Sequence, residues 1–281
     1  MRAASVLLLV LSVPVASADE PVALKWSLKE DDTFYATTRV TQTHTGEVGD
    51  KKFAAALAFD LTLRYHVKGV KEGETTIEVT YLAVGIRAEG RSGLDGIGEK
   101  VRGSTITIRL NENHALTAIR GHDALLKKFR DATDIERETA LAVFGEGGAR
   151  ELVGRPFDVL PPKAVRVGET LTRDDRTTVG GLTSTGKTNC KLESLTDGVA
   201  KVAVKSDMAI RASDGPAGAK LDLKSERAEG QYTFDTRTGR LKEFAHETVI
   251  AGTVTSNDTA VKITIRQKQT VTLSDKNPVR D

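Results

Sequence analysis

The stretch from Phe53 to Lys68, FAAALAFDLTLRYHVK, decides the fold class of this chain. A large or small apolar residue stands at every second position: Phe53, Ala55, Leu57, Phe59, Leu61, Leu63, Tyr65 and Val67. A period of two puts alternate side chains on opposite faces of an extended strand, as in a strand with one buried face. At about 3.3 Å per residue, residues 53–67 would run to roughly 50 Å, far beyond an ordinary strand. The pattern predicts a long, one-sided antiparallel strand that must bend or twist.

Similar alternation marks most of the remaining chain. The other predicted strands cover 76–88, 105–110, 183–194, 200–212, 221–234, 241–254 and 261–273. At Tyr81-Leu82 the apolar residues change from odd to even positions, which predicts a β-bulge. We therefore expect a mainly β fold of the α+β class.

One segment interrupts the strands with a helical pattern. Thr133-Asp134-Ile135-Glu136 has the spacing of a capping box, and Asp123 is a candidate cap for an earlier helix, which predicts two helices between about 122 and 144. The glycine-rich residues 145–148 are interpreted as a flexible segment that follows the second helix. A short third turn is expected at 149–153.

Two pairs of similar turn sequences are separated by the same number of residues. Gly73 and Gly198, which each follow an acidic residue at an expected hairpin turn, are 125 residues apart. Leu116 and Leu241 are also 125 residues apart. A shared offset favours an internal duplication, although antiparallel proteins also reuse turn chemistry. The expected architecture is two duplicated, curved antiparallel sheets with long strands and a helical insert between the halves.

The expected domain organisation is a signal peptide followed by one compact unit. It consists of a cleaved signal peptide at 1–18, a first β half at 19–121, a helical insert at 122–162 and a second β half at 163–281. Arg2 precedes a short apolar run, and Ala16 and Ala18 supply small residues before a cleavage point at Asp19. The run is too short to span a bilayer, and no other stretch qualifies. The chain is expected to be exported, to a bacterial periplasm or the extracellular space.

Three stretches carry a resemblance to a known family. Residues 24–34, 122–129 and 231–241 resemble an uncharacterised family of exported bacterial proteins, a domain of unknown function. The resemblance implies an envelope or secreted setting and carries no activity or binding residue. In shape, long bent strands crossed by helices are also similar to the half-barrels of periplasmic lipoprotein and lipid carriers.

Composition and side-chain spacing exclude several kinds of chemistry. With 41 Lys and Arg against 39 Asp and Glu, the formal net charge of +2 makes a nucleic-acid partner unexpected. The five histidines and Cys190 show no metal-ligand spacing, so we expect no metal and no cofactor. Cys190 is interpreted as a small buried residue on a strand face. No catalytic residues are expected.

Two function classes remain, with a third behind them. The first is a non-enzymatic binding or carrier module whose groove, lined by Phe53, Leu57, Phe59, Leu61, Leu63 and Tyr65, takes an apolar ligand such as a lipid, or another envelope protein. The second is a structural or interaction protein of the envelope with a closed core. The third is a hydrolase with dispersed catalytic residues. The sequence leaves open the oligomeric state and whether the groove is open or filled.

Overall fold

The computed structural model describes residues 20–279, apart from 91–92, 180–181, 213–219 and 257–258. The predicted signal peptide at 1–18 and its cleavage point lie outside the described residues. Among the described residues, no helix combines the length and apolar character needed to cross a membrane.

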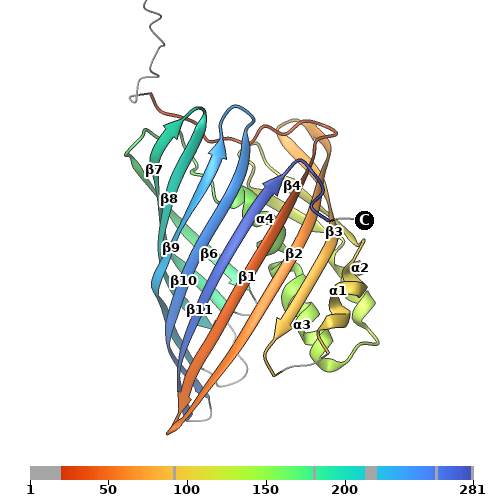
Figure 1. Cartoon of the computed structure of the whole chain (residues 1–281), viewed down its shortest axis with the longest axis vertical. Coiled ribbons are helices and arrows are strands. Elements are labelled where there is room, and N and C mark those ends of the chain that lie inside the picture. Colours follow the sequence, from red (N-terminus) through yellow and green to blue (C-terminus); the bar gives the residue numbers. More distant parts are fainter. Residues whose placement is uncertain (1–19, 91–92, 180–181, 213–219, 257–258, 280–281) are drawn as a thin grey trace, which may run out of the picture.

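The described strands form one antiparallel sheet (Figure 1). In chain order they are β1 (Thr33–Val48), β2 (Lys51–Lys71), β3 (Glu74–Ala88), β4 (Thr105–Leu110), β5 (Leu116–Arg120), β6 (Thr170–Val179), β7 (Leu182–Thr196), β8 (Val199–Ala212), β9 (Lys220–Asp235), β10 (Arg240–Ser256) and β11 (Thr259–Ser274). Their order across the sheet is β5-β4-β3-β2-β1-β11-β10-β9-β8-β7-β6. The mainly β class is confirmed.

The expectation of two separate sheets is wrong, because the first strand pairs with the last. β1 and β11 run antiparallel from the Tyr35–Ser274 pair to the Glu47–Lys262 pair. These backbone hydrogen bonds remove the free edge that each half would otherwise leave at this place. The two halves therefore join into a single sheet with β5 and β6 at its edges.

The predicted bulge at Tyr81-Leu82 is confirmed. Thr62 pairs with Ala83 and Leu63 pairs with Tyr81, which leaves Leu82 as the extra residue of β3. Such an insertion restores the alternation of side chains after the change of register.

Helices occupy two connections of the sheet. Helix α1 (Asp95–Val101) lies between β3 and β4, and the others lie between β5 and β6: α2 (His122–Leu126), the 3-10 turn η1 (Lys127–Phe129), α3 (Asp134–Phe144) and α4 (Glu146–Asp158). The predicted capping box begins α3: the Thr133 hydroxyl accepts from the Glu136 backbone N–H at 3.3 Å, and the Glu136 carboxylate accepts from the Thr133 N–H at 3.0 Å. Helix α1 was not predicted from the sequence.

Two details of the helical prediction are wrong. Gly121 with φ 93°, and not Asp123, is the N-cap of α2. The glycines after Gly145 belong to the first turn of α4, which continues through Pro156 to Asp158. Ala149, Val153 and Phe157 recur every four residues on its buried face, and the free energy of burying that face outweighs the weak helix propensity of the glycines.

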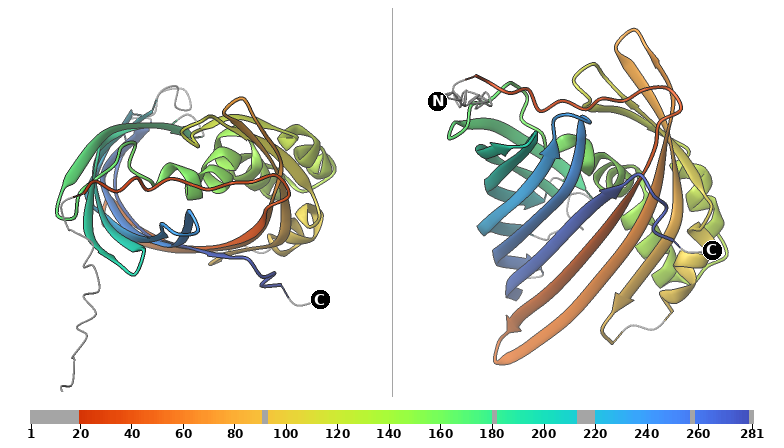
Figure 2. Two further views of the ribbon diagram at one scale, coloured as in Figure 1. Left: turned by 90° about the horizontal axis from the view of Figure 1, so that it is seen from above. Right: turned by 45° about the horizontal axis from the view of Figure 1, so that its top comes forward.

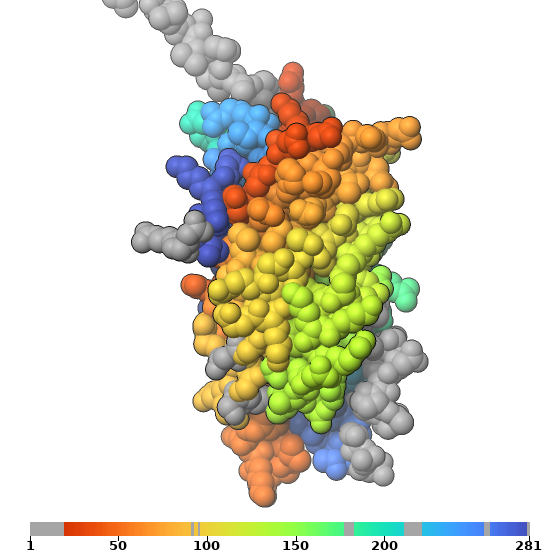
Figure 3. All heavy atoms as spheres, turned by 90° about the vertical axis from the view of Figure 1, so that its right-hand side faces the viewer, coloured from red at the N-terminus to blue at the C-terminus, as the bar shows by residue number. Residues whose placement is uncertain are grey.

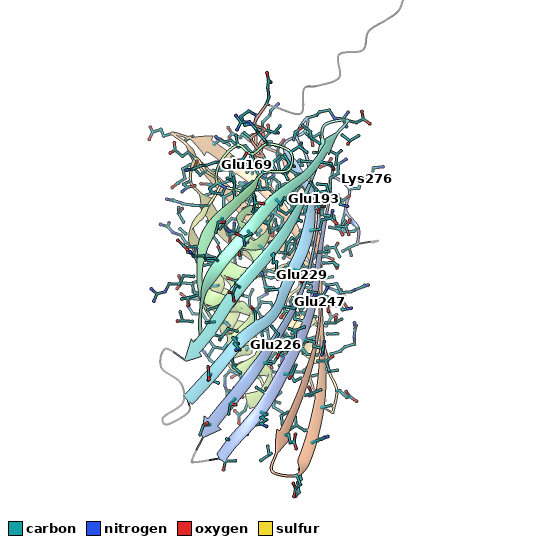
Figure 4. All side chains as sticks on the ribbon, turned by 90° about the vertical axis from the view of Figure 1, so that its left-hand side faces the viewer. Glu169, Glu193, Glu226, Glu229, Glu247 and Lys276 are labelled. Carbon is teal, nitrogen blue, oxygen red and sulfur yellow. The ribbon has the colours of Figure 1, made fainter. Side chains whose placement is uncertain are left out.

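The strands follow one another around an interior that α4 enters (Figure 2). We call the face of the sheet toward α4 the inner face. The opposite, outer face is charged: Figure 4 shows Glu193, Glu229 and Glu247 on β7, β9 and β10, and each has a Lys or Arg within 3.9 Å. The segment from α1 to α3 lies at the surface beside β3 (Figure 3). Charged side chains on the outer face thus alternate along these strands with the side chains of the inner face.

An aromatic cluster fills the interior beneath the segment 20–32. Trp26 packs against Phe34, Phe157 and Phe234, with ring centroids 5.6, 4.9 and 6.4 Å away. The Tyr65 ring stacks on Phe34 at 4.9 Å, and its hydroxyl donates to the Val153 carbonyl of α4 at 3.1 Å. These contacts bring both halves of the sheet and α4 into one core.

Candidate functional site

The residues predicted to line a groove divide into three groups along β2. Phe53 is 42% exposed near the end of the β1–β2 hairpin, and its ring covers Gly46 so closely that a Cβ there would lie 2.2 Å from it. Leu61, Leu63 and Tyr65 are at most 1% exposed and belong to the packed core. Between these two ends, Leu57 and Phe59 line an open pocket.

We call this space the apolar pocket; its volume is about 340 Å³. It lies between the inner face of β1, β2, β3 and β11 and the helices α3 and α4. Its lining is Val40, Gln42, Leu57, Phe59, Ile86, Thr139, Ala142, Val143, Gly148, Glu151, Leu152, Arg155, Gln267 and Gln269. A volume of this order is in the range of small-molecule sites, about 300–1,000 Å³.

A second space of about 370 Å³, the polar pocket, lies between α4 and the inner face of the second half of the sheet. Its lining is Glu151, Arg155, Asp158, Val159, Arg173, Asp175, Arg176, Ser184, Thr188, Val204, Ser206, Met208, Phe244 and His246. Glu151 and Arg155 border both pockets. The two pockets therefore lie on either side of these two side chains of α4.

The guanidinium of Arg155 lies over the Phe244 ring, with its Cζ 5.8 Å from the ring centroid. Phe244 in turn stacks with His246 at 5.8 Å. Burial, with the positive charge of Arg155 as a smaller cause, lowers the pKa of His246 to about 4. His246 is consequently neutral at pH 7, and its Nδ1 lies 3.1 Å from the Thr248 hydroxyl.

Arg173, Asp175 and Asp158 are further charged groups of the polar pocket. Arg173 pairs with Asp175 at 2.9 Å and also donates to the backbone carbonyl of Asp158. Partial desolvation, with the negative charge of Glu151 as a smaller cause, raises the pKa of Asp158, although the residue is exposed by its surface area. The positive charges of Arg155, Arg173 and Arg150 act in the opposite direction. This end of the pocket offers an internally compensated ion pair and a carboxyl group that is more easily protonated than usual.

Nucleophilic and metal chemistry receives no support from the described residues. Cys190 is buried, as predicted, and its burial raises the pKa of the thiol, which disfavours the reactive thiolate. Within the described part of the chain, no three His, Cys, Asp or Glu side chains gather as a metal site.

Glu151 and Arg155 were not predicted from the sequence, because α4 was not expected as a full helix. A signal was available: Ala149, Val153 and Phe157 form an apolar row at helical spacing, with Glu151 and Arg155 four residues apart on another face. The glycines and Pro156 of the same segment obscured it.

Comparison with known proteins gives one informative likeness. No family model and no curated protein sequence matches the chain. A solved structure described as lipid–protein interactions in lipovitellin aligns with a TM-score of 0.52 at 12% identity, over 90% of this chain. The match spans 26% of the lipovitellin chain, so this chain covers about a quarter of its relative. At this identity the likeness shows a shared fold only.

Two further structural matches are weaker. An outer membrane channel from Pseudomonas putida F1 aligns with a TM-score of 0.26 at 9% identity, over 91% of this chain and 99% of that chain. A DUF1329 family protein from Desulfovibrio piger aligns with a TM-score of 0.15 at 11% identity, over 89% and 88%. The resemblance to an uncharacterised exported family stays a prediction.

Proposed function

We propose that the chain is a non-enzymatic carrier that binds an apolar ligand in the apolar pocket, and that it works after export from a bacterial cytoplasm. The pocket between β2, α3 and α4 is the observation that carries the proposal. Leu57 and Phe59 contribute apolar side chains to its wall, and Val40, Ile86 and Leu152 continue the same surface. Apolar surface that is not packed gains free energy when a ligand removes it from water.

The shared fold with lipovitellin supports a lipid as the ligand. Lipovitellin is a protein whose structure displays lipid–protein interactions, and its alignment covers most of this chain. A lipid would also account for an interior that is packed at its aromatic end and open beside Leu57. An envelope protein with a closed core is the alternative, and a hydrolase with dispersed residues is the third hypothesis.

The proposal is tested with the neutral fluorescent probe N-phenyl-1-naphthylamine and the chain from Asp19 onward. We expect saturable binding by the unaltered protein. Leu57→Asp should weaken binding by about 10-fold or more, because it brings a carboxylate into the apolar pocket. Leu57 is only half-buried, so the melting temperature should fall by much less than binding does.

Two variants serve as controls. Val70→Asp places the same charge on β2 at a residue that is 43% exposed and lines neither pocket, and it should leave binding unchanged. Leu61→Ala removes a packed core side chain and should cost about 2–5 kcal/mol of stability. If the folded, unaltered protein binds no probe and yields no lipid on solvent extraction, the closed-core alternative is correct. Release of a cleaved product from an added ester would favour the hydrolase.

A further inference from the structure

Arg155 forms no close ion pair with a carboxylate inside the described part of the molecule. It is half-buried on α4, and among the described residues it makes no ion pair at 4.0 Å or less. Its guanidinium contacts the face of Phe244. The attraction between Arg155 and the Asp158 carboxylate acts over more than 4.0 Å, so an anion that binds the guanidinium directly would add hydrogen-bonded compensation.

Two other arginines near the site are already engaged, and a third, Arg176, lines the polar pocket but is exposed. Arg173 in the polar pocket forms an ion pair with Asp175 and donates hydrogen bonds to the backbone carbonyls of Asp158 and Leu160. Arg150, on the same helix as Arg155, donates to the Leu116 carbonyl at 2.8 Å and lines neither pocket. Arg155 is therefore placed for a group that enters from outside.

The position of Arg155 relates it to the apolar pocket. It borders that pocket on one side and the polar pocket on the other. The first contains Leu57 and Phe59, and the second contains hydroxyl groups such as Ser206 and Thr188. An amphiphile with its chain on Leu57 and Phe59 would bring its polar end to Arg155.

Resting on the proposed function, we propose that the ligand is an anionic amphiphile whose carboxylate or phosphate is held by Arg155 at the junction of the two pockets. A planar guanidinium can donate two parallel hydrogen bonds to either group. Glu151, one turn earlier on α4, borders the same junction and opposes the anion by its negative charge. It therefore limits the affinity that Arg155 provides.

The experiment compares three ligands that share one twelve-carbon chain and differ in their head: laurate, dodecyl phosphate and 1-dodecanol. Each displaces N-phenyl-1-naphthylamine from the chain that begins at Asp19. We expect at least one anion to bind about 10-fold more tightly than the alcohol, as a hydrogen-bonded charge provides. The tighter of laurate and dodecyl phosphate identifies the source of the anion, a fatty acid or a phospholipid.

Variants assign the preference to Arg155. Arg155→Gln should reduce the affinity for the anion to that for dodecanol, and Arg155→Lys should retain part of the preference. Glu151→Gln should strengthen anion binding. Arg150→Gln, a matched change on the same helix, should leave all three ligands unaffected.

Different results would overturn this inference and the proposed function. Equal binding of anions and dodecanol by the unaltered protein, or an unchanged preference in Arg155→Gln, overturns the role of Arg155 while probe binding upholds the carrier. Absence of binding of the probe and of all three ligands overturns both.

Discussion

At the scale of single residues, the protonation states of the groups in the interior depend on their burial and on the charges near them. His246 and Arg155 both face the polar pocket, and neither gains from a second positive charge nearby. Arg173 avoids the same difficulty through Asp175. The inner face thus keeps a neutral imidazole beside an arginine.

The low pKa of His246 predicts acid sensitivity. The folded-state pKa of about 4 lies below the ordinary 6.5, so the unfolded chain binds the proton more readily. The stabilisation is complete above about pH 6.5 and is lost as the pH falls toward 4. Between pH 7 and pH 4.5 this one group should cost about 2 kcal/mol of stability.

His246→Gln isolates that contribution. Urea unfolding at pH 7 and pH 4.5 should show a smaller loss of stability in the variant than in the unaltered protein, by about 2 kcal/mol. An equal loss in both proteins would mean that His246 is not responsible.

At the scale of elements, the hairpin turns follow from two-residue sequences. The β2–β3 turn is Glu72-Gly73 and the β7–β8 turn is Asp197-Gly198, and all four residues have φ between 50° and 78°. Positive φ at both central positions is the type I′ turn, which matches the twist of the adjoining strands. The two predicted glycines thus occupy equivalent turns, and a duplication of the halves stays a prediction.

The turn between β2 and β3 predicts opposite effects of two substitutions. Glu72→Asn should stabilise the fold by a few tenths of a kcal/mol, because Asn tolerates positive φ better than Glu. Gly73→Ala should destabilise it by about 1–2 kcal/mol, since φ is 78° and the new Cβ would lie 3.3 Å from Glu112. Thermal unfolding measures both, and a change of the same sign in the two variants would contradict the type I′ assignment.

At the scale of the whole molecule, the β1–β11 pairing and the aromatic cluster connect the halves. Trp26 contacts Phe34 of β1, Phe157 of α4 and Phe234 of β9. Neither half can unfold without opening the sheet between β1 and β11 and exposing this cluster.

We therefore expect one cooperative unfolding transition. Fluorescence of Trp26, the single tryptophan, and far-ultraviolet circular dichroism should give the same midpoint in urea. Two separate midpoints would show that the halves are independently stable.

The sequence by itself determined the local features of this protein. Alternation identified β2, a change of parity located the bulge at Leu82, and a Thr and a Glu three residues apart located the capping box of α3. Each of these depends on residues close together in the chain, whose period or hydrogen bonds require no distant partner. Only the tertiary structure decided that β1 pairs with β11, that Leu57 and Phe59 line a pocket while Leu61 and Tyr65 are packed, and that Arg155 lies at the junction of two pockets. All eight apolar residues of 53–67 share one face of the same strand, and what covers each of them depends on where α3 and α4 end against the sheet. That placement is set by the packing of segments about a hundred residues apart, which no local pattern encodes.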